Sequence, residues 1–250
     1  MPVEKLKEIR GNFLTEKYKA VFFDAGGTLL RPFPSVGEIY RDVAARYGCL
    51  TDCKTLETLF RTAWLHRDGL TSLVSHSDEK KEKQWWRSLV HEVFSAVGGV
   101  DPFEEFFDEL YDLFGHPSVW RLYPGTLELL QQLKDKGYFL GIISNWDSRL
   151  HQLVEKFELS RYFEFVLASA CVGSAKPGKA IFEMALQKAN VKADEAVHIG
   201  DSIEDDIRGA QSAGLAAILI NRHPERSSKL AESFKHVRVI HNLAELSRIF

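Results

Sequence analysis

The fold of this chain is indicated by one short stretch near its start, residues 19–29, which read Lys-Ala-Val-Phe-Phe-Asp-Ala-Gly-Gly-Thr-Leu. Residues 19–23 form a mostly apolar run of the kind that favours a buried β-strand, and Asp24 follows it directly. Two glycines and a threonine come next, which is typical of a tight loop at the end of a strand. We therefore predict a buried strand that presents an aspartate at its carboxyl end.

Further apolar runs in the second half of the chain have the length of short strands. They span residues 138–143, 163–167, 196–199 and 216–220. Segments with helical spacing separate them, such as the one marked by Ile181, Ala185 and Ala189. Short apolar strands that alternate with helices indicate a parallel sheet covered on both faces. The predicted fold class is therefore α/β, with a Rossmann-like parallel sheet core and helices on both faces.

The stretch 33–120 differs from this core, because it has few strand-like runs and its apolar residues fall at helical spacing. We predict four helices there, marked by Ile39, Val43 and Tyr47, by Leu56, Leu59, Phe60 and Ala63, by Trp86, Leu89, Val90, Val93 and Phe94, and by Phe103, Phe106, Phe107, Leu110, Tyr111 and Phe114. Residues 33–120 are accordingly predicted to form an inserted all-helical cap domain. The core then comprises residues 19–32 and 121–250, and residues 1–18 form an N-terminal extension.

Composition limits the classes of partner. The 32 Lys and Arg residues against 35 Asp and Glu residues argue against a nucleic-acid-binding protein, which needs an excess of positive charge. The longest nearly unbroken apolar stretch, residues 213–220, is far too short to span a membrane. The first residues lack the apolar region of a secretory signal, and three cysteines suit a reducing compartment. We expect a cytoplasmic protein without a membrane or nucleic-acid partner; its oligomeric state is unknown from sequence.

Polar residues follow the predicted strands, where open α/β sheets bind their ligands. The residues are Asp24 to Thr28, Ser144 and Asn145, Lys176, and Asp201 with Asp205 and Asp206. Carboxylates that converge in one crevice repel each other unless a cation is present, and hard oxygen ligands of this kind suit Mg²⁺. A lysine and a hydroxyl beside that ion form a phosphate clamp, and an aspartate at a strand end can act as a nucleophile. The residues therefore indicate Mg²⁺-dependent phosphoryl transfer.

The same motifs, in this order, resemble those of the haloacid dehalogenase-like hydrolase superfamily. They are Asp24-x-Gly-Gly-Thr28-Leu29, Ser144-Asn145, Lys176-Pro177 and Gly200-Asp201-Ser-x-x-Asp-Asp206. The resemblance covers roughly residues 20–221, and the helical insert after the first motif resembles the helical-cap branch of that superfamily.

This resemblance implies a role for each matching residue. Asp24 would be the nucleophile and a Mg²⁺ ligand, Ser144 would hydrogen-bond the phosphoryl group, and Lys176 would neutralise nucleophile and phosphate. Asp201 and Asp206 would hold the metal, together with the backbone carbonyl of residue 26. The residues predicted to bind the substrate are Thr28, Asn145 and Trp146, the last because it directly follows the Ser-Asn pair. Asp205 ranks below the other acids, and His198, inside a strand, is interpreted as a core residue.

One position departs from the superfamily's phosphatases. Two residues after the nucleophile they carry a second aspartate, which protonates the leaving group and later activates water, whereas this chain has Gly26. General acid–base catalysis raises the reaction rate by about 10²–10⁴-fold, so ordinary phosphatase activity should be strongly reduced unless another group replaces the missing aspartate. Candidates in the cap are Glu38, His66, His76 and His91, and a phosphonatase would need a cap lysine such as Lys80, Lys81 or Lys83.

The function predicted from sequence is hydrolysis of a small phosphorylated metabolite through an aspartyl-phosphate on Asp24. The alternatives are a catalytically weakened protein that binds a phospho-ligand, and phosphonatase or dehalogenase chemistry with a group from the cap. Against dehalogenation, the chain keeps Asp201, a metal-binding acid that dehalogenases do not need. The cap carries no motif that names the substrate.

Overall fold

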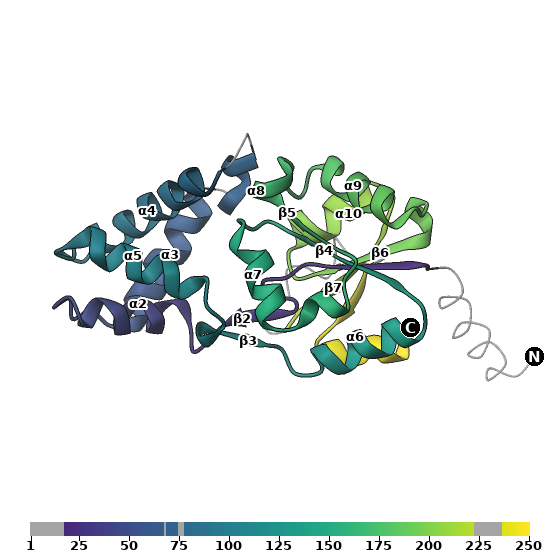
Figure 1. Cartoon of the computed structure of the whole chain (residues 1–250), viewed down its shortest axis with the longest axis horizontal. Helices are drawn as coiled ribbons and strands as arrows, with labels where there is room; N and C mark the ends of the chain where they lie inside the picture. Colours follow the sequence, from purple (N-terminus) through teal and green to yellow (C-terminus); the bar gives the residue numbers. More distant parts are fainter. Residues whose placement is uncertain (1–17, 68, 75–77, 223–236) are drawn as a thin grey trace, which may run out of the picture.

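The computed structural model describes residues 18–67, 69–74, 78–222 and 237–250 (Figure 1). Almost all of the predicted N-terminal extension lies outside these described residues, and so does His76, one of the candidate acids of the cap. The described residues form an α/β part and a helical part, which lie on opposite sides of Figure 1.

The α/β part is built on a six-stranded sheet in which every neighbouring pair of strands is parallel. Its order is β5 (Phe165–Ala168), β4 (Phe139–Ser144), β1 (Ala20–Phe23), β6 (Ala196–Gly200), β7 (Ala216–Ile220) and β8 (Arg238–Ile240). The five predicted strands are all present, with ends shifted by no more than two residues. Strand β8 was not predicted, since it has three residues and two of them are exposed.

Helices cover both faces of this sheet (Figure 1). Side chains that alternate along β1 explain the two layers: Val21 and Phe23 pack on one face, whereas Ala20 and Phe22 pack on the other. The first face is covered by α6 (Thr126–Asp135), α7 (Arg149–Lys156) and η7 (Leu243–Arg248), and the second by α9 (Lys179–Ala189) and α10 (Gly209–Ser212). The predicted Rossmann-like fold class is confirmed. No helix in the described ranges has the length and apolar character required to cross a membrane.

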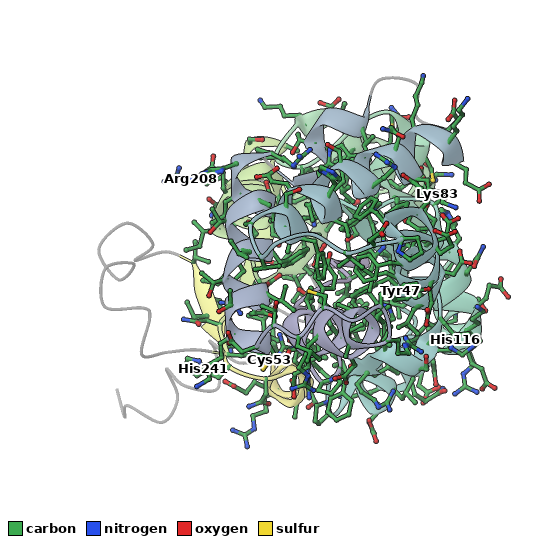
Figure 2. All side chains as sticks on the ribbon, turned by 90° about the vertical axis from the view of Figure 1, so that its left-hand side faces the viewer. Tyr47, Cys53, Lys83, His116, Arg208 and His241 are labelled. Atoms are coloured by element: carbon green, nitrogen blue, oxygen red, sulfur yellow. The ribbon has the colours of Figure 1, made fainter. Side chains whose placement is uncertain are left out.

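The helical part has its own apolar core, to which Leu153 of α7 also belongs. Its main helices are α2 (Val36–Ala45), α3 (Cys53–His66), α4 (Glu79–Ser95) and α5 (Phe103–Phe114). The four predicted helices are present, although Tyr47, expected in the first, lies beyond its end. A short 3₁₀ helix, η1 (Gly69–Val74), lies between α3 and α4. Figure 2 views the molecule from this side, where charged side chains such as Lys83 point outward from the helices.

A two-stranded antiparallel ribbon carries the chain between the two parts (Figure 1). It pairs β2 (Leu30–Pro32) with β3 (Trp120–Leu122), so the chain leaves the core and returns to it side by side. The ribbon was not predicted, because a three-residue strand has almost no periodicity to detect. The stretch predicted as the cap, 33–120, lies between its two strands except for Trp120, which β3 includes.

Candidate active site

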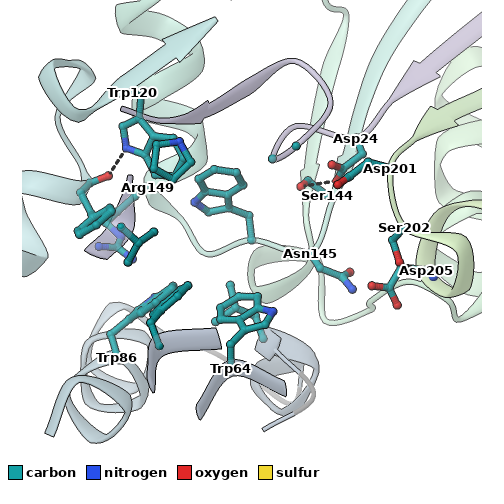
Figure 3. Close-up of a pocket in the computed structure, with 18 of the residues that line it drawn as sticks. Asp24, Trp64, Trp86, Trp120, Ser144, Asn145, Arg149, Asp201, Ser202 and Asp205 are labelled. Atoms are coloured by element: carbon teal, nitrogen blue, oxygen red, sulfur yellow. Dashed lines mark hydrogen bonds between the residues drawn. The ribbon is translucent and has the colours of Figure 1, made fainter. Parts of the chain in front are cut away.

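The polar residues that follow the strands meet in one pocket of about 420 Å³ between the α/β part and the helical part (Figure 3). Asp24 follows β1, Ser144 ends β4, and Asp201 follows β6. Lys176 comes from the loop after α8 (Ser169–Val172), and Asp206 from η5, a π-helical turn at Ile203–Arg208. Parallel strands place these carboxyl ends at the same edge of the sheet, which is why residues far apart in sequence converge here.

Asp24 is held at one of its two carboxylate oxygens. The Ser144 hydroxyl donates to Oδ1 at 2.8 Å, and the Lys176 ammonium donates to the same oxygen at 2.7 Å. Burial raises the pKa of Asp24, and the attraction of Lys176 offsets only part of this effect. The other oxygen, Oδ2, accepts no hydrogen bond from the described residues. This geometry fixes the carboxylate while leaving one oxygen for a metal or a substrate.

Lys176 bridges two acids, since its ammonium also donates to Asp206 Oδ1 at 2.5 Å. Burial by itself lowers the pKa of Lys176, but Asp206 and Asp24 outweigh it and hold the pKa above its ordinary value. The Asn145 side chain fixes this lysine through its backbone, donating to the Lys176 carbonyl at 2.8 Å and accepting from its N–H at 2.9 Å. Asn145, predicted to bind substrate, thus lines the pocket with its amide engaged in positioning the lysine.

Asp24, Asp201 and Asp206 form an acidic cluster in which one oxygen of each lies within 4.8 Å of the others. Asp201 is exposed at the pocket, although neighbouring atoms crowd its carboxyl group. This crowding, together with the charges of Asp24 and Asp206, raises the pKa of Asp201 to about 7. A divalent cation would relieve that repulsion, and three carboxylates supply the hard oxygen donors that Mg²⁺ takes. The donor set therefore fits the predicted metal.

The loop around Gly27 is shaped for a close approach to the cluster. Gly27 has φ +78°, and a Cβ placed on it would lie 2.3 Å from an Asp201 oxygen, so only glycine fits. The Thr28 hydroxyl lies 3.5 Å from the other Asp201 oxygen. Arg222 donates to the carbonyls of Gly27 and Thr28, the latter at 2.8 Å. Sequence reasoning missed Arg222, which belongs to no motif and reaches the loop only in the folded chain.

His198, interpreted from sequence as a core residue, is fully buried but also contacts the cluster. Its Nε2 lies 2.8 Å from Asp206 Oδ1, and its Nδ1 has no partner. Burial lowers the pKa of His198, so the ring is neutral and Nε2 donates to the carboxylate. Burial alone would raise the pKa of Asp206, yet Lys176 and His198 hold it below its ordinary range. Asp206 is therefore an anion tied to two side chains, and Ser202 N–H donates to its second oxygen at 2.9 Å.

The space beside Gly26 is occupied by the indole of Trp146. A Cβ built on Gly26 would lie 3.0 Å from Cζ3 of that ring, so any larger side chain requires the indole to move. Trp146, predicted from sequence to bind the substrate, lines the pocket and packs against Trp120 at 5.1 Å between ring centroids. Where the phosphatases of the superfamily are expected to carry their second acid, this chain has an apolar wall.

The helical side of the pocket is aromatic, with Trp64 and Trp86 among its lining residues (Figure 3). None of the remaining candidate acids and amines of the cap lines the pocket, namely Glu38, His66, His91, Lys80, Lys81 and Lys83. Asp205 does line it. The structure also brings in a buried group that the sequence did not reveal: the Trp86 indole N–H donates to Asp147 at 2.6 Å, and Arg149 forms an ion pair with the same carboxylate.

The chain is similar to known proteins in both sequence and fold. The family model described as haloacid dehalogenase-like hydrolase matches residues 18–214. The Xenopus laevis protein named haloacid dehalogenase-like hydrolase domain-containing protein 3 is 33% identical over 230 residues, covering 91% of this chain and 93% of that protein. Two solved structures, each 27% identical and each covering 93% of this chain and 97% of their own, also match. They are a HAD phosphatase from Thermococcus onnurineus, with a TM-score of 0.62, and a 2-haloacid dehalogenase from Pseudomonas syringae pv. Tomato DC3000, with a TM-score of 0.63. The chain therefore belongs to the haloacid dehalogenase-like hydrolases.

Proposed function

We propose that this chain is a Mg²⁺-dependent phosphatase that acts on a small phosphorylated molecule through an aspartyl-phosphate on Asp24. The observation that carries the proposal is the setting of Asp24. One of its oxygens is fixed by Ser144 and Lys176, and Asp201 and Asp206 stand within metal-binding distance of it. Nucleophile, cationic clamp and metal ligands are the parts that phosphoryl transfer needs.

In the first step, an Asp24 carboxylate oxygen attacks phosphorus and the bond from phosphorus to the leaving oxygen breaks. Ser144 and Lys176 lie close enough to Asp24 to hydrogen-bond the phosphoryl oxygens beside it. In the second step, water attacks the same phosphorus and frees Asp24. A bound Mg²⁺, held by Asp24, Asp201 and Asp206 with the Gly26 carbonyl expected from the family, would neutralise the negative charge of the phosphoryl group.

The acidic cluster favours a phosphatase over a dehalogenase. Both activities occur in the names of similar solved structures, so those names do not decide between them. Halide displacement by a carboxylate requires no metal, whereas this chain places three carboxylates within 4.8 Å of one another. Lys176 supplies one positive charge to this group of three carboxylates. The arrangement therefore stays electrostatically costly without a further cation, which supports metal-dependent chemistry. Phosphonatase chemistry, which cleaves a carbon–phosphorus bond with the help of a cap lysine, is less well supported. Lys83 is paired with Asp108 at 2.8 Å and lines no part of the pocket.

A second candidate function is binding of a phospho-ligand with little turnover. The observation that favours it is Trp146, whose ring lies against Gly26, where the second acid is missing. The location we propose is the cytoplasm, which suits the free thiols of Cys49, Cys53 and Cys171.

The test is hydrolysis of acetyl phosphate with Mg²⁺, together with Asp24→Asn. Acetyl phosphate is the probe because its leaving group departs without protonation. We expect turnover that needs Mg²⁺ and falls by about 10³-fold or more in Asp24→Asn, as when a covalent nucleophile is removed. The mass of the acid-quenched protein should rise by one phosphoryl group in the wild type alone.

The matched control is Asp52→Asn, the same change at an exposed helix cap of α3, which should leave turnover unchanged. Full activity in Asp24→Asn would refute the mechanism. Binding of phosphate without hydrolysis or phosphoenzyme would establish the second candidate function instead.

A further inference from the structure

We infer that this site acts on aryl phosphates, the phosphate monoesters whose leaving group is an aromatic hydroxyl. The inference rests on the proposed phosphatase function and specifies its substrate class. Two independent observations lead to it. One is the aromatic surface that the cap turns toward the pocket, and the other is the indole that fills the place of the missing acid.

Aromatic side chains dominate the cap side of the pocket (Figure 3). They include Tyr40, Phe60, Trp64, Trp86, Phe107 and Phe114. Trp64 and Trp86 stack with 5.7 Å between centroids and 30° between planes, and Trp120 and Trp146 carry the aromatic surface back to the Asp24 loop. The volume of about 420 Å³ falls within the range of small-molecule sites. A flat apolar group that leaves Asp24 toward the cap would therefore pack against aromatic faces and edges.

A negative charge on the leaving group would meet little opposite charge in this pocket. Apart from Arg149, its charged lining residues belong to the cluster around Asp24. Arg149 donates to both oxygens of Asp147, at 3.0 and 2.6 Å, and to the Tyr111 carbonyl at 3.0 Å. Its charge is thus matched by a fully buried carboxylate. A second phosphate or a carboxylate on the substrate would lose its water without gaining an unpaired cation, which is costly.

The missing acid selects the leaving group for a separate reason. An alcohol leaves as an alkoxide with a conjugate-acid pKa of about 16, close to that of water, so it needs a proton in the transition state. A phenol, with a pKa of about 10, departs as a stable anion without one. Glu38, His66 and His91 do not line the pocket, and the position two residues after Asp24, which the family's phosphatases use for protonation, carries Gly26 with the Trp146 ring beside it and offers no proton donor. The site is therefore suited to a leaving group that needs no protonation.

The chemistry balances without a further reactant. An Asp24 oxygen forms a bond to phosphorus, and the bond from phosphorus to the aryl oxygen breaks with its electron pair going to that oxygen. The aryloxide takes a proton from water after it departs. Water then attacks the aspartyl-phosphate, the bond from phosphorus to the Asp24 oxygen breaks, and the water proton passes to the released phosphate or to solvent. The sum is aryl phosphate plus water giving phenol plus inorganic phosphate.

The test compares kcat/KM for three phosphate monoesters of similar size with Mg²⁺ present. Phenyl phosphate has an aromatic group and a good leaving group, benzyl phosphate has an aromatic group and an alcohol leaving group, and cyclohexyl phosphate has neither feature. We expect phenyl phosphate to exceed the other two by about 100-fold, the scale of an absent general acid. Benzyl phosphate within about tenfold of phenyl phosphate would overturn the inference, because it would mean that a general acid is at work.

Binding of phosphonates tests the aromatic subsite without measuring turnover. Phenylphosphonate, which has no ester bond to break, should quench tryptophan fluorescence and bind more tightly than methylphosphonate. Trp64→Leu should weaken phenylphosphonate binding about threefold to tenfold, the size of one aromatic contact, and leave methylphosphonate binding unchanged. Phe60→Leu serves in its place if Trp64→Leu does not fold. Equal loss of both ligands, or no loss of either, would contradict an aromatic subsite.

Hydrolysis of acetyl phosphate distinguishes failure of the aryl inference from failure of the phosphatase proposal. If it is hydrolysed through Asp24 but phenyl phosphate is not preferred over benzyl and cyclohexyl phosphates, the aryl inference fails and the phosphatase proposal stands. If neither acetyl phosphate nor phenyl phosphate is hydrolysed through Asp24, both the phosphatase proposal and the aryl inference fail.

Discussion

The two sides of the pocket are built in opposite ways. The core side gathers acids and one lysine at the edge of the parallel sheet, from strand ends, a loop and the turn η5. The cap side presents aromatic rings from helices whose spacing indicated only that they bury apolar surface. On the core side polar side chains are held by specific partners, as Lys176 is by Asp24 and Asp206. On the cap side the contacts are broad and largely nondirectional.

In the proposed function, this difference would separate the residues that carry out the chemistry from those that choose the substrate. Directional ion pairs hold a reacting group in one geometry, which phosphoryl transfer requires. An aromatic surface instead accepts many ligands of similar shape, and its selectivity comes from burial and ring contacts. Changes on the core side should therefore alter the rate of every substrate, whereas changes on the cap side should alter which substrate is used.

The largest effect on the core side is expected from Lys176→Met. The change leaves Asp24 and Asp206 buried without their shared cation. We expect turnover to fall about 10²–10³-fold and the free energy of unfolding to fall by about 3–5 kcal/mol. Activity on acetyl phosphate and urea unfolding measure the two losses. Lys134→Met is the control, since its pair with Glu164 is partly exposed and should contribute about 1 kcal/mol or less.

The affinity of the acidic cluster for Mg²⁺ is expected to depend on pH. Without metal, the pKa of Asp201 is raised to about 7, so its carboxyl group carries a proton below that pH. Mg²⁺ must displace this proton, so affinity should rise about tenfold per pH unit up to about pH 7 and then level off. Calorimetry in buffers of different ionisation enthalpy measures the released proton. In Asp201→Asn the affinity should be weaker and the slope lost; an unchanged slope in that variant would assign the proton to another group.

The smallest effect is expected where the two sides meet. Trp86→Phe keeps an aromatic ring but removes the N–H that donates to the buried Asp147 at 2.6 Å. The free energy of unfolding should fall by about 1–3 kcal/mol, the cost of leaving a buried acceptor short of a partner. Trp64→Phe removes a similar volume without a hydrogen bond to Asp147 and should cost less. Equal losses in the two variants, measured by urea unfolding, would show that the bond does not hold the two sides together.

Much of the fold and of the core side of the pocket could be predicted because the signals are local. A four-residue apolar run followed by Asp24 is readable wherever it occurs, and the parallel arrangement then brings Ser144, Lys176 and Asp201 to the same edge. The β2–β3 ribbon, the short edge strand β8 and Arg222 were missed. The strands are too short for periodicity, and the arginine acts on carbonyls nearly two hundred positions away.

The sequence by itself determined the class of fold, the order of the motifs, the acids that can hold a metal and the glycine at position 26, because each depends on residue type and short spacing. Only the tertiary structure decided what surrounds that glycine. It placed the Trp146 ring beside it, tied His198 and Lys176 to Asp206, and turned an aromatic surface toward Asp24. These contacts join residues from different strands, helices and loops. Their geometry is set by how the layers pack, which no local pattern contains.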